Sequence, residues 1–181
     1  MELIEHVVGT RQIYDGKIIH LRVDTVQLPN GHESLREIVS HRGAVCIVPF
    51  RADGCILMVH QFRLAAGRVL LEIPAGTMEA GEDPEECAAR ELEEETGFKP
   101  GAIRKLFSAF LSPGYSTEQI HAYVATDLQD GVVHLDAGEN VSVIAVPVNE
   151  VEGKIASGEI EDAKTIAALL MALRQHDRSA T

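Results

Sequence analysis

Apolar and polar positions alternate along the first part of the chain in the way that is typical of β-strands. β-branched residues alternate with polar ones in KIIHLRVDTVQL (residues 17–28) and in SLREIVSH (residues 34–41). Asn30-Gly31 and Asp53-Gly54 suit tight turns, because such turns need positive φ angles. The apolar runs GAVCIVPF and CILMVHQF are therefore expected to form a hairpin about Asp53-Gly54.

The second half of the chain predicts more strands and then helices. The strand-like runs are AIRKLFSAFL, QIHAYVATDL, VVHL and VSVIAVPV, and two short helices follow, the last at about residues 162–176. Strands interspersed with helical segments favour an α/β fold in which helices pack on a mixed sheet.

Residues 83–97 carry consistent signals for a helix. Asp83 suits the N-cap and Pro84 the first helical position, with Glu86 three residues after the cap. Gly97 can adopt the left-handed conformation that ends a helix. A narrow apolar stripe is expected to pack on the sheet, and it consists of Cys87, Ala88, Leu92 and Ala89.

The charges of this helix are unusual. Residues 79–95 contain nine acids and one arginine, a net charge of -8. Glu91 and Glu95 lie one turn apart, with Glu94 beside them, on what is expected to be the outward face. A solvated acidic face is the ordinary explanation, and it accounts for Glu85, Glu86 and Glu93. A hard divalent cation such as Mg2+ would explain why carboxylates gather on one face.

Composition limits the functions that the chain can have. The 181 residues, 45% of them hydrophobic, predict one compact domain with an N-terminal appendage. The net charge of -12 argues against nucleic acid as a partner. Cys46, Cys55 and Cys87 form no CxxC pair, and no secretion signal or long apolar run is visible. We expect a cytoplasmic protein that does not enter membranes.

The acidic segment resembles a known family. GTMEAGEDPEECAARELEEETGF matches the Nudix box at Gly76, Glu82, Arg90, Glu91, Leu92, Glu94, Glu95, Gly97 and Phe98. HQFR, LLEIPAG and SPGYSTE resemble the ADP-ribose pyrophosphatase subgroup, in which a proline stands about fifteen residues after the box. Pro113 lies at that spacing from Phe98.

The resemblance implies a Nudix-type α/β/α sandwich around a mixed sheet, with an N-terminal antiparallel β subdomain. Residues 1–42 would form that β region and help to make a homodimer, and residues 43–181 would form the hydrolase domain. The implied reaction is hydrolysis of the pyrophosphate bond of ADP-ribose to AMP and ribose 5-phosphate, with Mg2+ or alternatively Mn2+. Two alternatives stay open: another nucleotide sugar or dinucleotide as substrate, and a non-catalytic nucleotide sensor.

The resemblance also assigns roles in catalysis. Glu91, Glu94, Glu95 and the carbonyl of Ala75 would bind the metal ion, with Glu94 otherwise pairing with Arg90. Glu82 would brace the loop. The catalytic base would be Glu139 in DAGEN, with Asp136 as the second choice, although an ordinary polar turn is the more common role of a loop glutamate.

Six further residues are candidates for substrate binding. Arg63 could grip a phosphate bidentately or form a structural ion pair. Arg36 could reach a phosphate across a dimer interface or remain an ordinary surface arginine. Glu72 could contact substrate or metal, or cap a sheet edge. The remaining candidates lie in SPGYSTE and are Pro113, Gly114 and Glu118.

Overall fold

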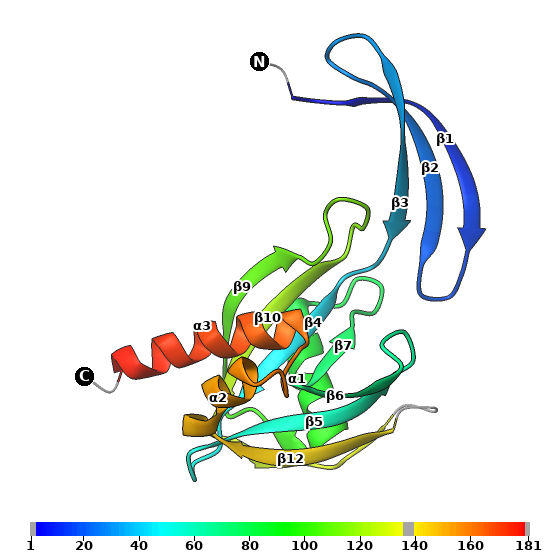
Figure 1. Ribbon diagram of the computed structural model, residues 1–181. Coiled ribbons are helices and arrows are strands. Elements are labelled where there is room, and N and C mark those ends of the chain that lie inside the picture. The colour runs from blue at the N-terminus through cyan, green and yellow to red at the C-terminus, as the bar shows by residue number, and fades with distance from the viewer. Residues whose placement is uncertain (1–2, 136–139, 180–181) are drawn as a thin grey trace. The chain divides into compact units, whose positions relative to one another are not determined.

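The computed structural model describes residues 3–135 and 140–179 of the chain (Figure 1). Two compact units can be distinguished within it. The first unit comprises Met1–Gly43 and Ala109–Gln119, and the second comprises Ala44–Ser108 and Ile120–Thr181. The division predicted from the sequence, at residues 42 and 43, remains a prediction.

The first unit is built on an antiparallel sheet of three strands in the order β1-β2-β3. Gly31, with φ of 82°, makes the predicted turn between β2 and β3, and its N–H donates to the carbonyl of Leu28 at 2.9 Å. Val39 exchanges backbone hydrogen bonds with Tyr115 and Thr117, which ties the second segment of this unit to β3. The strands are β1 (His6–Asp15), β2 (His20–Gln27) and β3 (Glu33–Ser40).

The second unit contains two larger sheets and one short pair. Their strand orders are β7-β4-β10-β9, β12-β5-β6 and β11-β8. Strands β4 and β10 run parallel, whereas β4 and β7 run antiparallel, so the first of these sheets is mixed as predicted. The strands are β4 (Ala44–Pro49), β5 (Cys55–Arg63), β6 (Arg68–Glu72), β7 (Ala75–Thr77), β8 (Phe98–Lys99), β9 (Ala102–Phe110), β10 (Gln119–Thr126), β11 (Gln129–Asp130) and β12 (Val141–Pro147).

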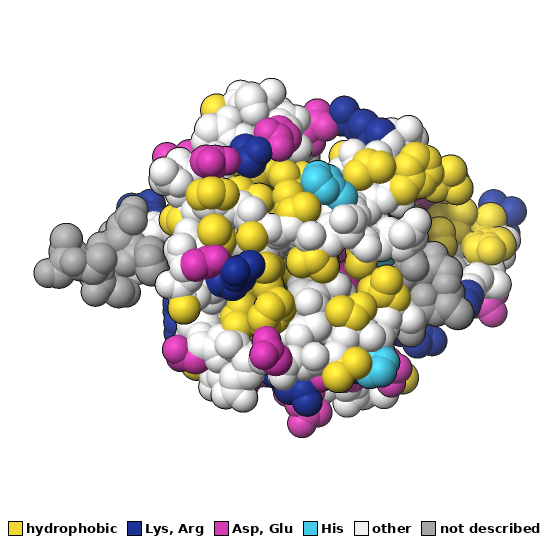
Figure 2. Space-filling view, turned by 90° about the horizontal axis from the view of Figure 1, so that it is seen from below, with side chains coloured by type: hydrophobic (Ala, Val, Ile, Leu, Met, Phe, Trp, Pro, Cys, Tyr) yellow, Lys and Arg dark blue, Asp and Glu magenta, His cyan; other side chains and the backbone are white. Residues whose placement is uncertain are grey.

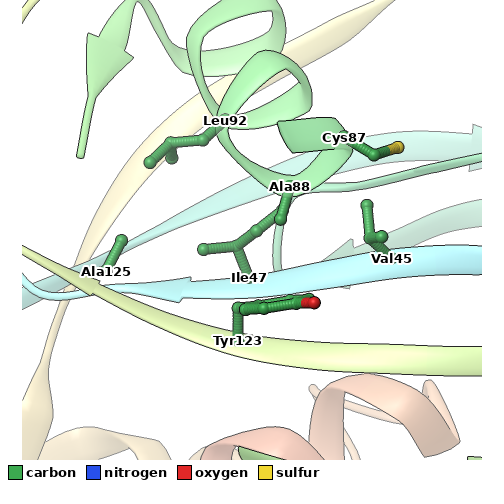
Figure 3. Packing of buried hydrophobic residues seen from close by; sticks show 7 residues of the cluster. All are labelled: Val45, Ile47, Cys87, Ala88, Leu92, Tyr123 and Ala125. Atoms are coloured by element: carbon green, nitrogen blue, oxygen red, sulfur yellow. The ribbon is translucent and has the colours of Figure 1, made fainter. Parts of the chain in front are cut away.

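The helices pack on both faces of the mixed sheet. Both α1 and α3 contact β4, and Figure 3 shows them on opposite sides of that strand. The helical elements are α1 (Pro84–Thr96), the 3-10 turn η1 (Val148–Glu150), α2 (Val151–Ala156) and α3 (Ala163–Ser179). Among the described residues, no helix is both long and apolar enough to cross a bilayer.

The core between α1 and the sheet contains the predicted apolar stripe. Cys87, Ala88 and Leu92 are fully buried, and they pack against side chains of β4 and β10 (Figure 3). Ala89, the fourth predicted member of the stripe, is only partly buried. The partners on the strands are Val45, Ile47, Tyr123 and Ala125. Small side chains at positions 87 and 88 allow the helix to approach the sheet closely.

Two of the predicted strand arrangements are wrong. The chain turns at Gly54 as expected, but β4 and β5 belong to different sheets, and the isolated bridge beside the turn joins Ile56 to Phe50, which follows β4. Both runs are apolar on both faces, so their pattern carries no information about which strand is the partner. The run VVHL is not a strand, because its N–H groups bind α1 instead: Val132 donates to the Glu93 side chain and His134 to the Glu94 carbonyl.

Candidate active site

Helix α1 begins and ends where the sequence predicts. The Asp83 side chain accepts hydrogen bonds from the N–H groups of Glu85, at 2.8 Å, and Glu86, at 3.4 Å. At the other end Gly97 adopts φ of 75°, and its N–H donates to the carbonyl of Glu93 at 2.8 Å. These caps satisfy backbone groups that the helix ends would otherwise leave unpaired, so the helix is fixed in register.

The loop before α1 is braced by Glu82. Its carboxylate accepts from the N–H of Glu79 at 2.8 Å and from Nε of Arg90 at 2.8 Å. The hydrogen bond from Arg90 is the largest influence on Glu82 and lowers its pKa to about 2, although burial acts in the opposite direction. Glu82 is therefore ionised at neutral pH and binds the loop to the helix.

Arg90 binds three acidic side chains through one guanidinium group, and they belong to Glu82, Glu91 and Glu94. Its Nη1 donates to Oε1 of Glu91 and to Oε2 of Glu94, each at 2.8 Å. Its Nη2 donates to Glu82 at 3.1 Å and contacts the Cys87 sulfur at 3.3 Å. The hydrogen bond with Glu82 is the main reason that the pKa of Arg90 is raised. The charge crowding noted in the sequence is thus partly offset within the helix itself.

Glu91 lies directly under the glycine that opens the acidic segment. A Cβ atom added at Gly76 would lie 2.0 Å from Cδ of Glu91 and 2.1 Å from its Oε1. No side chain larger than hydrogen fits there while Glu91 keeps this position. The close approach of Glu91 is the reason that residue 76 must be glycine. Its backbone conformation is not the reason, since its φ angle is not positive.

Glu95 is held by the backbone of β7. The N–H of Ala75 donates to Oε2 of Glu95 at 3.1 Å, and Ala75 itself pairs with Cys46 in β4. Only 7% of Glu91 and 2% of Glu95 are exposed, so the expectation that they lie on an outward face is wrong. Helical spacing placed both on one face, but β7 covers that face.

The donor set suits a hard divalent cation. Carboxylate oxygens and a backbone carbonyl are the ligands that Mg2+ and similar ions prefer. Within residues 3–135 and 140–179, no three Asp, Glu, His or Cys side chains are arranged as a ready metal cage. The bonds of Arg90 to Glu91 and Glu94 hold those two carboxylates, so binding a metal ion would require part of this cluster to rearrange. The predicted ligands that the structure brings together are Ala75, Glu91, Glu94 and Glu95.

Arg63 and Glu72 form a close ion pair between β5 and β6. Nε and Nη2 of Arg63 each donate to one oxygen of Glu72 at 2.8 Å. The structural ion pair that the sequence left open for Arg63 is therefore present, and its substrate contact remains a prediction. Burial raises the pKa of Glu72, but Arg63 and Lys164 together lower it below the ordinary value.

Lys164 contributes to this site and was not predicted. Its ammonium group donates to Glu72 and, at 2.8 Å, to Asp162. One signal in the sequence could have revealed it. A lysine in the first turn of a helix is disfavoured by the helix dipole, so its presence there suggests a specific acidic partner.

The remaining predicted residues belong to the first unit or lie outside the described residues. Arg36 pairs with Glu5, its Nε donating to Oε2 at 2.9 Å. Glu118 lies 3.9 Å from Nδ1 of His41. Pro113 and Gly114 lie in the connection between β9 and β10, where a Cβ atom at Gly114 would meet nothing within 4 Å. The predicted base Glu139 and its alternative Asp136 lie outside the described residues.

The charged side chains can be followed on one face of the molecule. On the face that Figure 2 shows, Lys and Arg side chains are scattered among acidic and apolar ones rather than gathered into one basic surface.

Comparison with known proteins identifies the family. Residues 40–169 match the model of the NUDIX domain, and residues 5–39 match that of the nucleoside diphosphate sugar hydrolase N-terminal domain. The chain belongs to the Nudix family. The recognition made from the acidic segment is thereby confirmed, and with it the assignment as a Nudix pyrophosphohydrolase.

Several relatives match over most of their length. An ADP-ribose pyrophosphatase of Bacillus subtilis (strain 168) is 42% identical, with 92% of this chain and 91% of the relative covered. A methanol dehydrogenase activator of Bacillus methanolicus is also 42% identical, with 91% and 90% covered. A GDP-mannose pyrophosphatase of Yersinia enterocolitica serotype O:8 / biotype 1B is 37% identical, with 76% of each chain covered.

A solved structure confirms the predicted α/β fold. The crystal structure of an ADP compounds hydrolase superimposes with a TM-score of 0.89, covers 99% of this chain and 98% of its own, and is 20% identical in sequence. At that identity the likeness concerns the fold alone.

Proposed function

We propose that this protein hydrolyses the pyrophosphate bond of ADP-ribose to AMP and ribose 5-phosphate with Mg2+, or Mn2+ in its place. The observation that carries the proposal is the position of Glu91 and Glu95 against β7, with Glu94 joined to Glu91 through Arg90, in a chain 42% identical to a named ADP-ribose pyrophosphatase. A phosphoanhydride is slow to hydrolyse without a cation to neutralise its charge and activate water. The site offers oxygen ligands for such a cation.

The residues divide this work between them. Glu91, Glu94, Glu95 and the Ala75 carbonyl hold the metal ion, which when bound polarises phosphoryl oxygens and acidifies a water molecule. Arg90 orients Glu91 and Glu94 through its Nη1. We assign the general base to Glu139, with Asp136 as the alternative, because hydrolysis also needs a group that accepts the proton of the attacking water.

Six residues are proposed to form the substrate site, five by direct contact and Glu72 by holding Arg63. Arg63 binds a phosphate with the part of its guanidinium that Glu72 does not use, and Glu72 fixes the orientation of that group. Arg36 is a second phosphate ligand. The ribose side of the substrate is assigned to the connection between β9 and β10, which includes Pro113, Gly114 and Glu118.

Incubation of the purified protein with ADP-ribose and Mg2+ tests the reaction. We expect AMP and ribose 5-phosphate in equal amounts, and activity should fall more than about hundredfold in Glu95→Gln, which loses one ligand charge. Glu86→Gln is the matched control, because Glu86 is an exposed glutamate of the same helix. The proposal is wrong if no AMP forms at any pH tested. The metal assignment is wrong if Glu95→Gln keeps full turnover.

A second candidate substrate class is supported by one observation. A relative 37% identical over 76% of the chain is named a GDP-mannose pyrophosphatase, and Nudix folds share chemistry but not pockets. Ranking ADP-ribose, GDP-mannose and dinucleotides by kcat/KM separates the two. A non-catalytic sensor is the remaining alternative, and it predicts that Glu95→Gln still binds ADP-ribose and that the wild type releases no product.

We further propose that the protein is a cytoplasmic homodimer in which residues 1–42 form the dimerising region and residues 43–181 the hydrolase domain. Support comes from β1, in which all ten residues are exposed, including the apolar side chains Val7, Val8, Ile13 and Tyr14. Sedimentation of the full chain beside a truncation lacking the first forty residues tests this. A full chain that sediments as a monomer contradicts it.

A further inference from the structure

Four charged side chains of alternating sign form a chain of ion pairs in the second unit. Arg63 binds Glu72, Glu72 binds Lys164, and Lys164 binds Asp162. They come from three separate segments: the end of β5, the end of β6 and the start of α3. This arrangement links the N-terminus of α3 to the strand that leads into Ala75.

Asp162 has a second role that must be separated from its charge. Its Oδ2 accepts from the N–H of Thr165 at 3.0 Å and from the Thr165 hydroxyl at 2.6 Å, which is the geometry of a helix N-cap. The Thr165 hydroxyl oxygen in turn accepts from the N–H of Ile73 at 3.1 Å. An asparagine at position 162 would keep the capping interaction, because Asn caps helices as well as Asp does.

Lys164 occupies a position that is unfavourable for a cation. Only 12% of its side chain is exposed, and it stands in the first turn of α3, where the helix dipole repels positive charge. Glu72, with 2% of its side chain exposed, already has both oxygens bound by Arg63. Lys164 is therefore not needed to satisfy the hydrogen bonding of Glu72. The effect of Lys164 must lie in the charge balance of the group.

The charge balance decides how strongly Arg63 can attract an anion. Arg63 and Lys164 together match the charges of Glu72 and Asp162, whereas without Lys164 the group would carry a net charge of -1. Arg63 is the most exposed of the four, with 40% of its side chain accessible. Its Nη1 makes no hydrogen bond within the part of the chain that the structure describes, so that edge of the guanidinium can receive a ligand.

We propose that Lys164 is a positioning residue for substrate. By neutralising Glu72 it leaves the positive charge of Arg63 available to a diphosphate, whereas the negative charge of Asp162 weakens that attraction. The inference rests on the proposed function, in which Arg63 binds a substrate phosphate. It gives loss of the Asp162 charge the opposite expected effect on binding from loss of the Lys164 charge. A purely structural role for the network would make every disruption act in the same direction.

Calorimetric titration with ADP-ribose in EDTA tests the proposal without turnover. Lys164→Met should weaken binding about tenfold, equivalent to about 1.4 kcal/mol, and Lys164→Arg should restore most of it. Asp162→Asn should strengthen binding by several fold, because it removes a negative charge and keeps the cap. These differences should shrink as salt is raised. With Mg2+ present, Lys164→Met should raise KM while kcat changes little.

Lys154→Met is the matched control. Lys154 also pairs with an acid, Glu159, but that carboxylate is 51% exposed. The control should bind ADP-ribose as the wild type does. Thermal unfolding of each variant shows whether it is folded, and if Lys164→Met does not fold, Asp162→Asn decides the question alone.

Three results would overturn the inference. They are unchanged binding in a folded Lys164→Met, weaker binding in Asp162→Asn, and no binding of ADP-ribose by the wild type. Failure of the proposed function looks different: the wild type binds ADP-ribose and the variants follow the expected order, but no AMP forms with Mg2+. Lys164 would then still position ADP-ribose, in a site that binds the molecule without hydrolysing it.

Discussion

Replacing Gly76 with alanine tests how the proposed metal ligands are positioned. The new Cβ atom would lie 2.0 Å from Cδ, 2.1 Å from Oε1 and 2.3 Å from Oε2 of Glu91. Ordinary contact begins at 3.4 Å, so the carboxylate must retreat by about 1.4 Å. The obstacle is the far end of a flexible side chain, and the backbone of β7 can therefore stay in place.

This geometry separates the effect on stability from the effect on function. Moving one carboxylate should lower the free energy of unfolding by about 1 kcal/mol, the usual scale for a single substitution. Mg2+ binds oxygen at about 2.0–2.1 Å in nearly ideal octahedral geometry, so a ligand displaced this far no longer reaches it. A misplacement of about 1 Å can cost on the order of hundredfold in rate. We expect Gly76→Ala to lose about hundredfold in kcat/KM and to need more Mg2+ for half-maximal activity.

The assay is AMP release from ADP-ribose over a Mg2+ titration, together with thermal unfolding in EDTA. Gly153→Ala is the matched control, because it makes the same chemical change inside α2, where a Cβ atom meets nothing within 4 Å. The control should be fully active and more stable by about 0.5–1 kcal/mol. If Gly76→Ala retains the Mg2+ dependence and turnover of the wild type, Glu91 is not a metal ligand in this position.

Two further predictions follow from pKa values. The pKa of Glu82 is lowered to about 2, chiefly by its hydrogen bond with Arg90, from an ordinary 4.5. Its stabilising effect is therefore complete above about pH 4.5 and is lost as the pH falls towards about 2. Urea unfolding should show a shallower loss of stability over that window in Glu82→Gln than in the wild type, and equal slopes would contradict this. Burial is the main cause that raises the pKa of Cys46 and Cys87 to about 12. A thiol reagent at mildly alkaline pH should therefore label at most Cys55 before denaturation and all three cysteines after it, and rapid labelling of Cys46 or Cys87 in the folded protein would show that the core between α1 and the sheet is open.

The helix could be predicted from the sequence because its signals are local. The cap at Asp83, the stop at Gly97 and the stripe at Cys87, Ala88 and Leu92 all lie within one segment, and each has the predicted role. Strand pairing is different, because partners far apart in the sequence must be matched. Strand β4 pairs with β10 and β7, and nothing in its uniformly apolar sequence distinguishes these partners from β5.

The burial of the site could not be predicted for a related reason. Spacing of 3.6 residues per turn shows that Glu91 and Glu95 share a face of α1, but it does not show what covers that face. The cover is β7, whose contact with Glu91 depends on the missing side chain of Gly76. Lys164 was missed because its partner Glu72 is 92 residues away in the sequence.

The charges of the site connect the metal proposal with the inference about Lys164. Glu82, Glu91 and Glu94 pair with the single guanidinium of Arg90, and Glu95 binds the N–H of Ala75 instead. These four carboxylates and one guanidinium carry a net charge of -3. One divalent cation leaves the cluster still negative, and a diphosphate would then add two more negative charges. Substrate binding therefore needs further positive charge nearby, from a second cation or from the protein. If Arg63 and Lys164 supply that positive charge, the loss of ADP-ribose affinity in Lys164→Met should grow as the Mg2+ concentration is lowered. A second cation acting alone would leave that loss of affinity independent of Mg2+.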